Sequence, residues 1–373
     1  MINLGHGANG AEMAALYGKK QEELIDFSSN INPFMSEHLV NSVQSALKSC
    51  QNYPDIHYTK LREVLSQYLS CEMKQIIPGN GATEIMYLLM KTLGESSRQK
   101  EEPFRLGIIN PTFSEYERSA KLNGLEIVPF QLKASTEFDL EVEELKARLH
   151  QIDGLFICNP NNPTGSSYSL ASIAKQMEEM QKLLIVDETF MEFVEEEAKY
   201  TLMPLVQCNN QLIIIKAVTK FFGLPGLRLG YGVTSNKDLL RGMYHFKEPW
   251  TVNGFAEYLT PILLEDKVFQ EKTKAYFKEE RHQLLKALKT LPNIKVYATT
   301  TNYILIELKT MTSQELKEQM IIKHNILIRD ASNFKGLNKH FIRVAIKGKA
   351  DNEKLLKAMQ EMLEARGNLC RGL

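Results

Sequence analysis

Short apolar runs alternate with longer amphipathic stretches through the first two thirds of the chain. The runs are rich in Leu, Ile and Val, as buried strands are, and they occupy residues 106–109, 125–130, 155–158, 183–186 and 212–215. Between them, Leu140, Leu145 and Leu149 share one face of a helix predicted over residues 139–151, with Asp139 as its expected N-cap. This alternation predicts an α/β fold, in which a mainly parallel sheet is covered by helices on both faces.

The pattern changes beyond about residue 262. A long charged helix is predicted over residues 265–291. Shorter segments follow it, with strands expected over residues 294–298, 303–308, 326–329 and 341–346 and helices over 313–324 and 351–366. This mixture is typical of a smaller α+β domain. We therefore expect a large domain over residues 36–262, and a second unit in which residues 1–35 join residues 263–373.

Composition excludes several classes of protein. The chain has 373 residues with 45 basic and 45 acidic side chains, so it lacks the positive surplus of a general nucleic-acid or membrane-surface binder. Its five cysteines are scattered and form no CxxC pair, which predicts neither a disulfide framework nor a metal site. No apolar run reaches the roughly 18 residues of a membrane helix. We expect a cytoplasmic protein.

A glycine-rich turn opens a predicted helix at residues 79–84 (GNGATE). The first backbone N–H groups of a helix, here at Ala82 and Thr83, favour an anion such as a phosphate. An ordinary glycine turn capped by Thr83 explains the same residues, so this motif alone leaves both interpretations open.

Two further polar segments follow predicted strands. Residues 159–165 (NPNNPTG) form a proline-restricted loop whose asparagine amides can reach a ligand. Asp187 comes directly after the strand at 183–186, one helix and one strand beyond Asn162, so both residues are expected at the same sheet edge. A carboxylate there needs a cationic partner. A helix cap or a structural ion pair is the alternative role for Asp187.

The densest motif is residues 218–231 (VTKFFGLPGLRLGY), which follow the strand at 212–215. An amine among apolar residues, as at Lys220, has a lowered pKa and can condense with an aldehyde. Thr219 and Arg228 supply a hydroxyl and a guanidinium suited to a phosphate.

Together these segments resemble the fold type I, aspartate-aminotransferase-like family of pyridoxal-5′-phosphate (PLP) enzymes over nearly the whole chain. The resemblance implies that PLP is the cofactor, that residues 36–262 form the PLP-binding domain, and that the protein is a homodimer with active sites at the interface. It implies that Lys220 and Asp187 are catalytic: Lys220 binds the cofactor aldehyde and Asp187 pairs with the pyridine nitrogen. The remaining implied cofactor contacts are Asn162 at the ring 3-oxygen, Phe113 stacked on the ring, Ala82, Thr83, Thr219 and Arg228 at the phosphate, and Tyr53 from the neighbouring subunit.

Two branches of this family are similar to the chain, the L-threonine-O-3-phosphate decarboxylases of cobalamin synthesis and the histidinol-phosphate aminotransferases. Residues 5–9 (GHGAN), 26–33 (DFSSNINP) and 249–253 (PWTVN) resemble the decarboxylase branch, although Ala8 stands where a second glycine is usual. Phe190 stands where most aminotransferases have tyrosine. The substrate-binding residues implied are His6, Asn32, Asn162, Arg329 and Arg343.

The expected reaction is therefore decarboxylation of L-threonine O-3-phosphate to (R)-1-amino-2-propanol O-phosphate and CO₂. L-Serine O-phosphate, one methyl group smaller, stays open as a substrate. Histidinol-phosphate aminotransferase is the alternative. A non-catalytic regulator built on this fold is a remote third interpretation, because neither a winged-helix segment nor a basic arm precedes residue 30. No nucleic-acid or membrane partner is expected.

Overall fold

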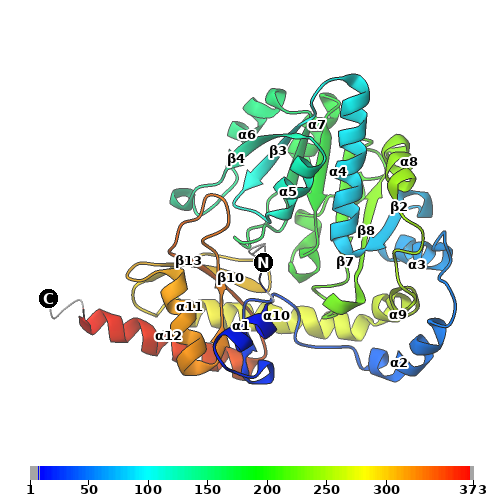
Figure 1. Cartoon of the computed structure of the whole chain (residues 1–373). Coiled ribbons are helices and arrows are strands. Elements are labelled where there is room, and N and C mark those ends of the chain that lie inside the picture. The colour runs from blue at the N-terminus through cyan, green and yellow to red at the C-terminus, as the bar shows by residue number, and fades with distance from the viewer. Residues whose placement is uncertain (1–6, 8, 370–373) are drawn as a thin grey trace.

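The computed structural model describes residues 7 and 9–369. The upper half of the molecule in Figure 1 contains a mixed, mostly parallel sheet. The sheet has seven strands in the order β2-β8-β7-β6-β5-β3-β4. Strand β8 is antiparallel to both β2 and β7, and all other neighbouring pairs are parallel. The strands are β2 (Ile76–Asn80), β3 (Arg105–Asn110), β4 (Glu126–Gln131), β5 (Gly154–Cys158), β6 (Leu183–Asp187), β7 (Leu212–Ala217) and β8 (Leu229–Thr234). The predicted α/β class and the five predicted strands are confirmed.

Helices cover both faces of this sheet. Side chains of a strand alternate between faces, so Phe156 packs with one helical layer while Leu155 and Ile157 pack with the other. The first layer contains α4 (Gly81–Lys100), α5 (Glu115–Leu122) and α8 (Lys237–Phe246), and the second contains α6 (Val142–Arg148) and α7 (Ala171–Glu179). Within the described chain no helix is both long and apolar enough to cross a bilayer.

Two local predictions need correction. The helix expected from Asp139 begins at Val142, after Glu141, and Asp139 instead accepts a hydrogen bond from the backbone N–H of Leu140. A carboxylate that bonds the next residue forms a local turn rather than a helix cap. Strands β2 and β8 were not predicted, because Pro78, Gly79 and the glycines of β8 hide their apolar positions.

The lower half of Figure 1 holds a second, antiparallel sheet with strand order β12-β13-β10-β9. Its strands are β9 (Ile294–Val296), β10 (Tyr303–Leu308), β12 (Arg329–Asp330) and β13 (Phe341–Ala345). The short strand β1 (Ile25–Asp26) pairs in parallel with β11 (Ile326–Leu327), and this pairing attaches the N-terminal segment to the C-terminal part of the chain. The remaining helices are α1 (Gly10–Leu16), α2 (Glu37–Ser49), α3 (Thr59–Leu69), α9 (Gly254–Glu265), α10 (Lys267–Leu288), α11 (Ser313–His324) and α12 (Lys349–Leu369). The division of the chain into domains near residue 262 stays our proposal.

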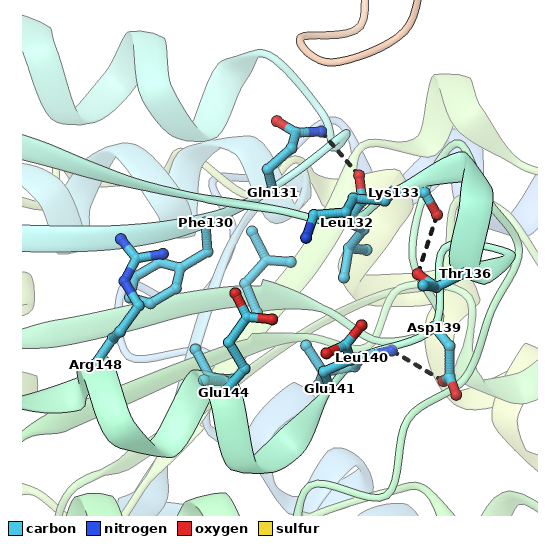
Figure 2. A pocket seen from close by; sticks show the side chains of 12 residues that line it. Phe130, Gln131, Leu132, Lys133, Thr136, Asp139, Leu140, Glu141, Glu144 and Arg148 are labelled. Atoms are coloured by element: carbon cyan, nitrogen blue, oxygen red, sulfur yellow. Dashed lines mark hydrogen bonds between the residues drawn. The ribbon is translucent and has the colours of Figure 1, made fainter.

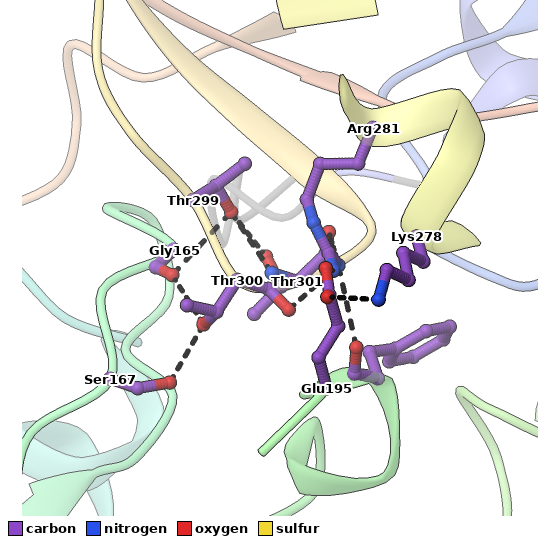
Figure 3. A network of polar contacts seen from close by, with 9 residues as sticks. Gly165, Ser167, Glu195, Lys278, Arg281, Thr299, Thr300 and Thr301 are labelled. Atoms are coloured by element: carbon purple, nitrogen blue, oxygen red, sulfur yellow. Dashed lines mark hydrogen bonds and ion pairs between the residues drawn. The ribbon is translucent and has the colours of Figure 1, made fainter. Parts of the chain in front are cut away.

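A buried arginine on α10 ties the C-terminal part of the chain to the sheet domain (Figure 3). One nitrogen of Arg281 donates to the carbonyl of Thr300 at 2.8 Å, and the other donates to Glu195 at 2.7 Å. Thr300 in turn donates its hydroxyl to the carbonyl of Gly165 at 3.0 Å. This chain of hydrogen bonds fixes the end of the 159–165 loop.

A second buried network lies under the edge where β6 and β7 end. The Lys216 ammonium is 3.1 Å from Glu192 and 3.5 Å from Glu188, and all three side chains are buried. Glu188 also accepts hydrogen bonds from Thr201 and from the backbone of Leu202. Burial disfavours the charged form of all three side chains. The two carboxylates nevertheless hold the pKa of Lys216 well above its usual value. The cluster braces the segment that follows Asp187.

Removing the lysine should therefore destabilise the fold. We expect Lys216→Met to lower the free energy of unfolding by about 3–5 kcal/mol, because two buried carboxylates lose their cation. Urea denaturation followed by circular dichroism measures this. Lys175→Met is the matched control, since the Lys175–Glu179 pair is exposed and should contribute less than about 1 kcal/mol. Equal losses in the two variants would contradict the role given to the cluster.

Candidate active site

The predicted chemical segments meet at one edge of the large sheet. Strands β3, β5, β6 and β7 are parallel, so the residues that follow their carboxyl ends lie together. They surround a cavity of about 320 Å³. Its lining includes the predicted residues Ala82, Thr83, Phe113, Asn162, Asp187, Thr219, Lys220, Arg228, Arg329 and Arg343.

Lys220 lies three residues beyond β7, and its side chain lines this cavity. Burial lowers the pKa of Lys220 to about 8, and Arg343 and Arg228 act in the same direction. Its ammonium nitrogen is 5.9 Å from the centre of the Phe190 ring, which offers no hydrogen bond. A neutral amine is the nucleophilic form, so the site favours condensation with an aldehyde near neutral pH.

Asp187 ends β6 and lines the same cavity. Its carboxylate accepts hydrogen bonds from the Tyr116 hydroxyl at 2.7 Å and from the backbone N–H of Thr189 at 2.9 Å. Burial raises the pKa of Asp187, and both hydrogen bonds oppose that rise. Among the described residues no cation forms a salt bridge with this carboxylate. A protonated pyridine nitrogen would supply the missing charge, so the residues fit PLP at this position.

A cradle for a phosphate lies where α4 begins. Gly81 has a φ of +80°, and a Cβ atom there would lie 2.6 Å from the Arg228 guanidinium. A Cβ on Gly230 would lie 2.2 Å from the backbone nitrogen of Ala82. Glycine at both positions lets the arginine and the first N–H groups of the helix approach one another, which is the arrangement a phosphate needs. This site fits the phosphate of PLP.

Arg329 and Arg343 face each other across the antiparallel strands β12 and β13, and both line the cavity. Arg343 donates to Asn162 Oδ1 at 2.5 Å and to the carbonyl of Ser28 at 2.8 Å, while its buried Nε has no partner among the described residues. Burial lowers the pKa of Arg343 to about 10, and Arg329 adds to this. The two arginines thus place two cations beside one cavity, which favours the binding of anionic groups there.

Two predicted residues lie elsewhere. Asn32 does not line the cavity: its side chain donates to the carbonyl of Phe221 at 2.7 Å and so supports the segment that carries Lys220. Tyr53 is 81% exposed and packs against Trp250, and its entry into a neighbouring subunit's site stays a prediction. His6 and Ala8 lie outside the described residues. The roles of Asn32 and His6 as substrate-binding residues therefore stay predictions.

Sequence reasoning missed Tyr116, which is buried and bonded to Asp187. One signal could have found it, because Tyr116 follows Phe113 by about one helical turn and the two rings lie 5.7 Å apart. It also missed Tyr303, whose hydroxyl donates to the carbonyl of Asn161 while its ring packs against Phe190 and lies 5.1 Å from the Arg343 guanidinium.

A smaller hollow of about 40 Å³ lies between the end of β4 and α6 (Figure 2). Arg148 covers the Phe130 ring there at 4.4 Å, and Glu141 and Glu144 line its rim. None of the predicted site residues lines it. In the part of the chain that the structure describes, no cluster of His, Cys, Asp and Glu is placed to hold a metal ion.

The pKa of Lys220 predicts how the apoprotein takes up PLP. The rate of uptake should rise with pH and level off above about 8, because the neutral amine is the reactive form. Absorbance of the bound cofactor, followed after mixing at a series of pH values, measures this. Lys220→Ala should bind no cofactor covalently. A rate still climbing at pH 10, as for an ordinary exposed lysine, would contradict the assignment.

Tyr116 should set the pH range over which Asp187 holds the cofactor. In Tyr116→Phe the Asp187 carboxyl loses a donor that stabilises its charged form, so its pKa rises. As the pH is lowered, the variant should therefore lose its affinity for PLP at a higher pH than the parent protein does. The shift should reach up to about 1 pH unit, since a hydrogen bond to a charge contributes about 1.5 kcal/mol. Fluorescence titration of apoprotein with PLP from pH 5 to 8 measures it. Tyr87→Phe, which removes a hydroxyl bonded to Glu115 instead, should leave the profile unchanged.

The chain is similar to known proteins over most of its length. The family model described as aminotransferase class I and II matches residues 22–361. A protein of Caldanaerobacter subterraneus subsp. tengcongensis, provisionally named as a threonine-phosphate decarboxylase, is 39% identical over 90% of this chain and 89% of its own length. The threonine-phosphate decarboxylase of Salmonella typhimurium is 32% identical over 97% of this chain and 98% of its own. The histidinol-phosphate aminotransferase structure from Clostridium acetobutylicum superposes with a TM-score of 0.85 at 31% identity, covering 92% of this chain and 100% of its own. The chain therefore belongs to the class I and II aminotransferase family and uses PLP as its cofactor.

Proposed function

We propose that the protein decarboxylates L-threonine O-3-phosphate, releasing CO₂ and (R)-1-amino-2-propanol O-phosphate, as a step in cobalamin synthesis. The observation that carries the proposal is the pair Arg329 and Arg343, which stand opposite each other and line one cavity with Lys220. Two guanidiniums beside one amine-binding position fit a small amino acid with two anionic groups. Threonine phosphate has a carboxylate and a phosphoryl group at either end of a short carbon chain.

The two arginines have different surroundings, which supports different roles. Arg343 is buried, bonded to Asn162 and Ser28, and its Nε is left to bind a ligand, so we assign it the substrate carboxylate. Arg329 lies nearer the edge of the cavity, where its guanidinium contacts Asn333 and the Phe334 ring. We assign it the phosphoryl group.

Bound PLP supplies an electron sink for the pair of electrons left at the α-carbon when a bond there breaks. The protein would select that bond by the way its residues orient the substrate beside the cofactor. Arg343 and Asn162 hold the carboxylate, and Arg329 holds the other end of the substrate. Lys220 is the lysine among the described residues that line the cavity, and we assign it the return of a proton to the α-carbon after CO₂ leaves.

Histidinol-phosphate aminotransferase is the second candidate, supported by the 31% identity and TM-score of 0.85 to the Clostridium structure. The same residues could serve it, because 2-oxoglutarate also carries two anionic groups. The two reactions differ in which bond at the α-carbon breaks, the one to the carboxylate or the one to the hydrogen. Phe190 favours the decarboxylase branch, since it cannot donate the hydrogen bond that tyrosine gives in most aminotransferases.

One assay separates the candidates. Purified holoenzyme is mixed with L-threonine phosphate, with L-serine phosphate, or with histidinol phosphate and 2-oxoglutarate, and CO₂ and glutamate are measured. We expect CO₂ from L-threonine phosphate, and less from L-serine phosphate, because one methyl group contributes about 1–3 kcal/mol of discrimination. Arg343→Gln should lose most of this activity. Glutamate without CO₂ would replace the decarboxylase proposal with the aminotransferase.

A further inference from the structure

The loop between β12 and β13, residues 331–340, leaves the smaller sheet and extends toward the end of β4 (Figure 1). Both ends of the loop are anchored on the smaller sheet. At one end Asp330 accepts hydrogen bonds from Ser313 and from the backbone of Ser332. At the other end the His340 ring contacts the carbonyl of Met311 at 2.9 Å. The loop therefore has a fixed base and a projecting tip.

The inner side of the loop contacts Arg329. Asn333 Oδ1 accepts a hydrogen bond from the Arg329 guanidinium at 2.8 Å, and the Phe334 ring lies 5.3 Å from it. Phe334 is buried, and it lines the cavity together with Asn333. The loop thus fixes the direction of the guanidinium and also forms part of the wall beside it.

The tip of the loop contacts the large-sheet part of the chain at two points. The Lys335 ammonium is 3.0 Å from Glu117 Oε2 on α5. Gly336, with a φ of +96°, comes so close to the Gln131 amide at the end of β4 that a Cβ atom would lie 1.9 Å from it. The contact at Glu117 lies only four residues beyond Phe113, which lines the cavity.

Glu117 is shared between two lysines. Its Oε1 is 2.6 Å from Lys121, which lies on the same helix, and its Oε2 binds Lys335. Burial alone would raise the pKa of Glu117, but the two ammoniums hold it below its usual value. The carboxylate is therefore charged at neutral pH. Of its two partners, Lys335 belongs to the loop and Lys121 belongs to α5 itself.

We propose that residues 331–340 form a lid over the phosphate end of the substrate, latched by the Lys335–Glu117 ion pair, and that Asn333 is a positioning residue for Arg329. This rests on the proposed function, in which Arg329 binds the phosphoryl group. When the lid is latched, Asn333 and Phe334 hold the guanidinium toward the cavity. When the ion pair breaks, the tip loses its charged contact with α5 and the substrate can exchange.

Kinetics of the holoenzyme test the latch. Lys335→Met should raise KM for L-threonine phosphate about three- to fivefold without lowering kcat, which is the upper range for an exposed ion pair. Lys121→Met is the matched control, because it removes the partner of the same carboxylate that does not cross to the loop, and its KM should stay within about twofold. Asn333→Ala should raise KM for the phosphorylated substrate, yet leave the affinity for L-threonine unchanged. Equal effects of the two lysine variants would overturn the latch.

Hydrogen exchange tests the lid independently of the reaction. Inorganic phosphate added to the holoenzyme should slow amide exchange in residues 331–340 in the parent protein and in Lys121→Met, and clearly less in Lys335→Met. Equal protection in Lys335→Met, or no protection in the parent protein, would overturn the proposal. If L-threonine phosphate yields no CO₂ while this protection pattern holds, the proposed reaction fails and the lid stands.

Discussion

The charge imbalance of one cavity is the constraint on which the rest of the site depends. Among its described lining residues, Lys220, Arg228, Arg329 and Arg343 are cationic, and Asp187 is the only carboxylate. Burial lowers the pKa values of Lys220 and Arg343, and the neighbouring cations lower them further. The anionic groups of PLP, and of the doubly anionic substrate that we propose, would relieve the repulsion among these cations. The ligands are therefore part of the electrostatic balance of the fold.

This arrangement is held by networks that never touch the ligand. The buried cluster at Lys216 braces the segment after Asp187, and the Arg281 network fixes the loop that carries Asn162. Each network contains a buried cation with specific partners, Lys216 in the first and Arg281 in the second, and such contacts restrict geometry. This rigidity matters because the outcome of the proposed reaction depends on how the substrate is oriented.

The two halves of the molecule contribute different residues to the cavity. The large sheet supplies the residues to which we assign PLP, on loops that follow the strand ends. The smaller sheet supplies Arg329 and Arg343, the arginines to which we assign the substrate, and both line the cavity from β12 and β13. A substrate that binds both arginines therefore brings the two sheets together. The loop at residues 331–340 adds a direct contact between them through Lys335 and Glu117.

The sequence by itself determined the α/β class, the five parallel strands β3 to β7 and most of the predicted residues that line the cavity. Strand periodicity is local, and the polar motifs directly follow the strands, so short-range patterns were enough. The sequence did not reveal β2 and β8, whose glycines interrupt the apolar pattern, and it misplaced the start of α6, where Asp139 forms a local turn. Only the tertiary structure decided that Tyr116 bonds Asp187, that Asn32 supports the Lys220 segment, and that Lys335 reaches Glu117. In these three contacts the two partners are separated along the sequence by 71, 189 and 218 positions, respectively. Contacts over such separations depend on how whole elements pack, and no local pattern encodes them.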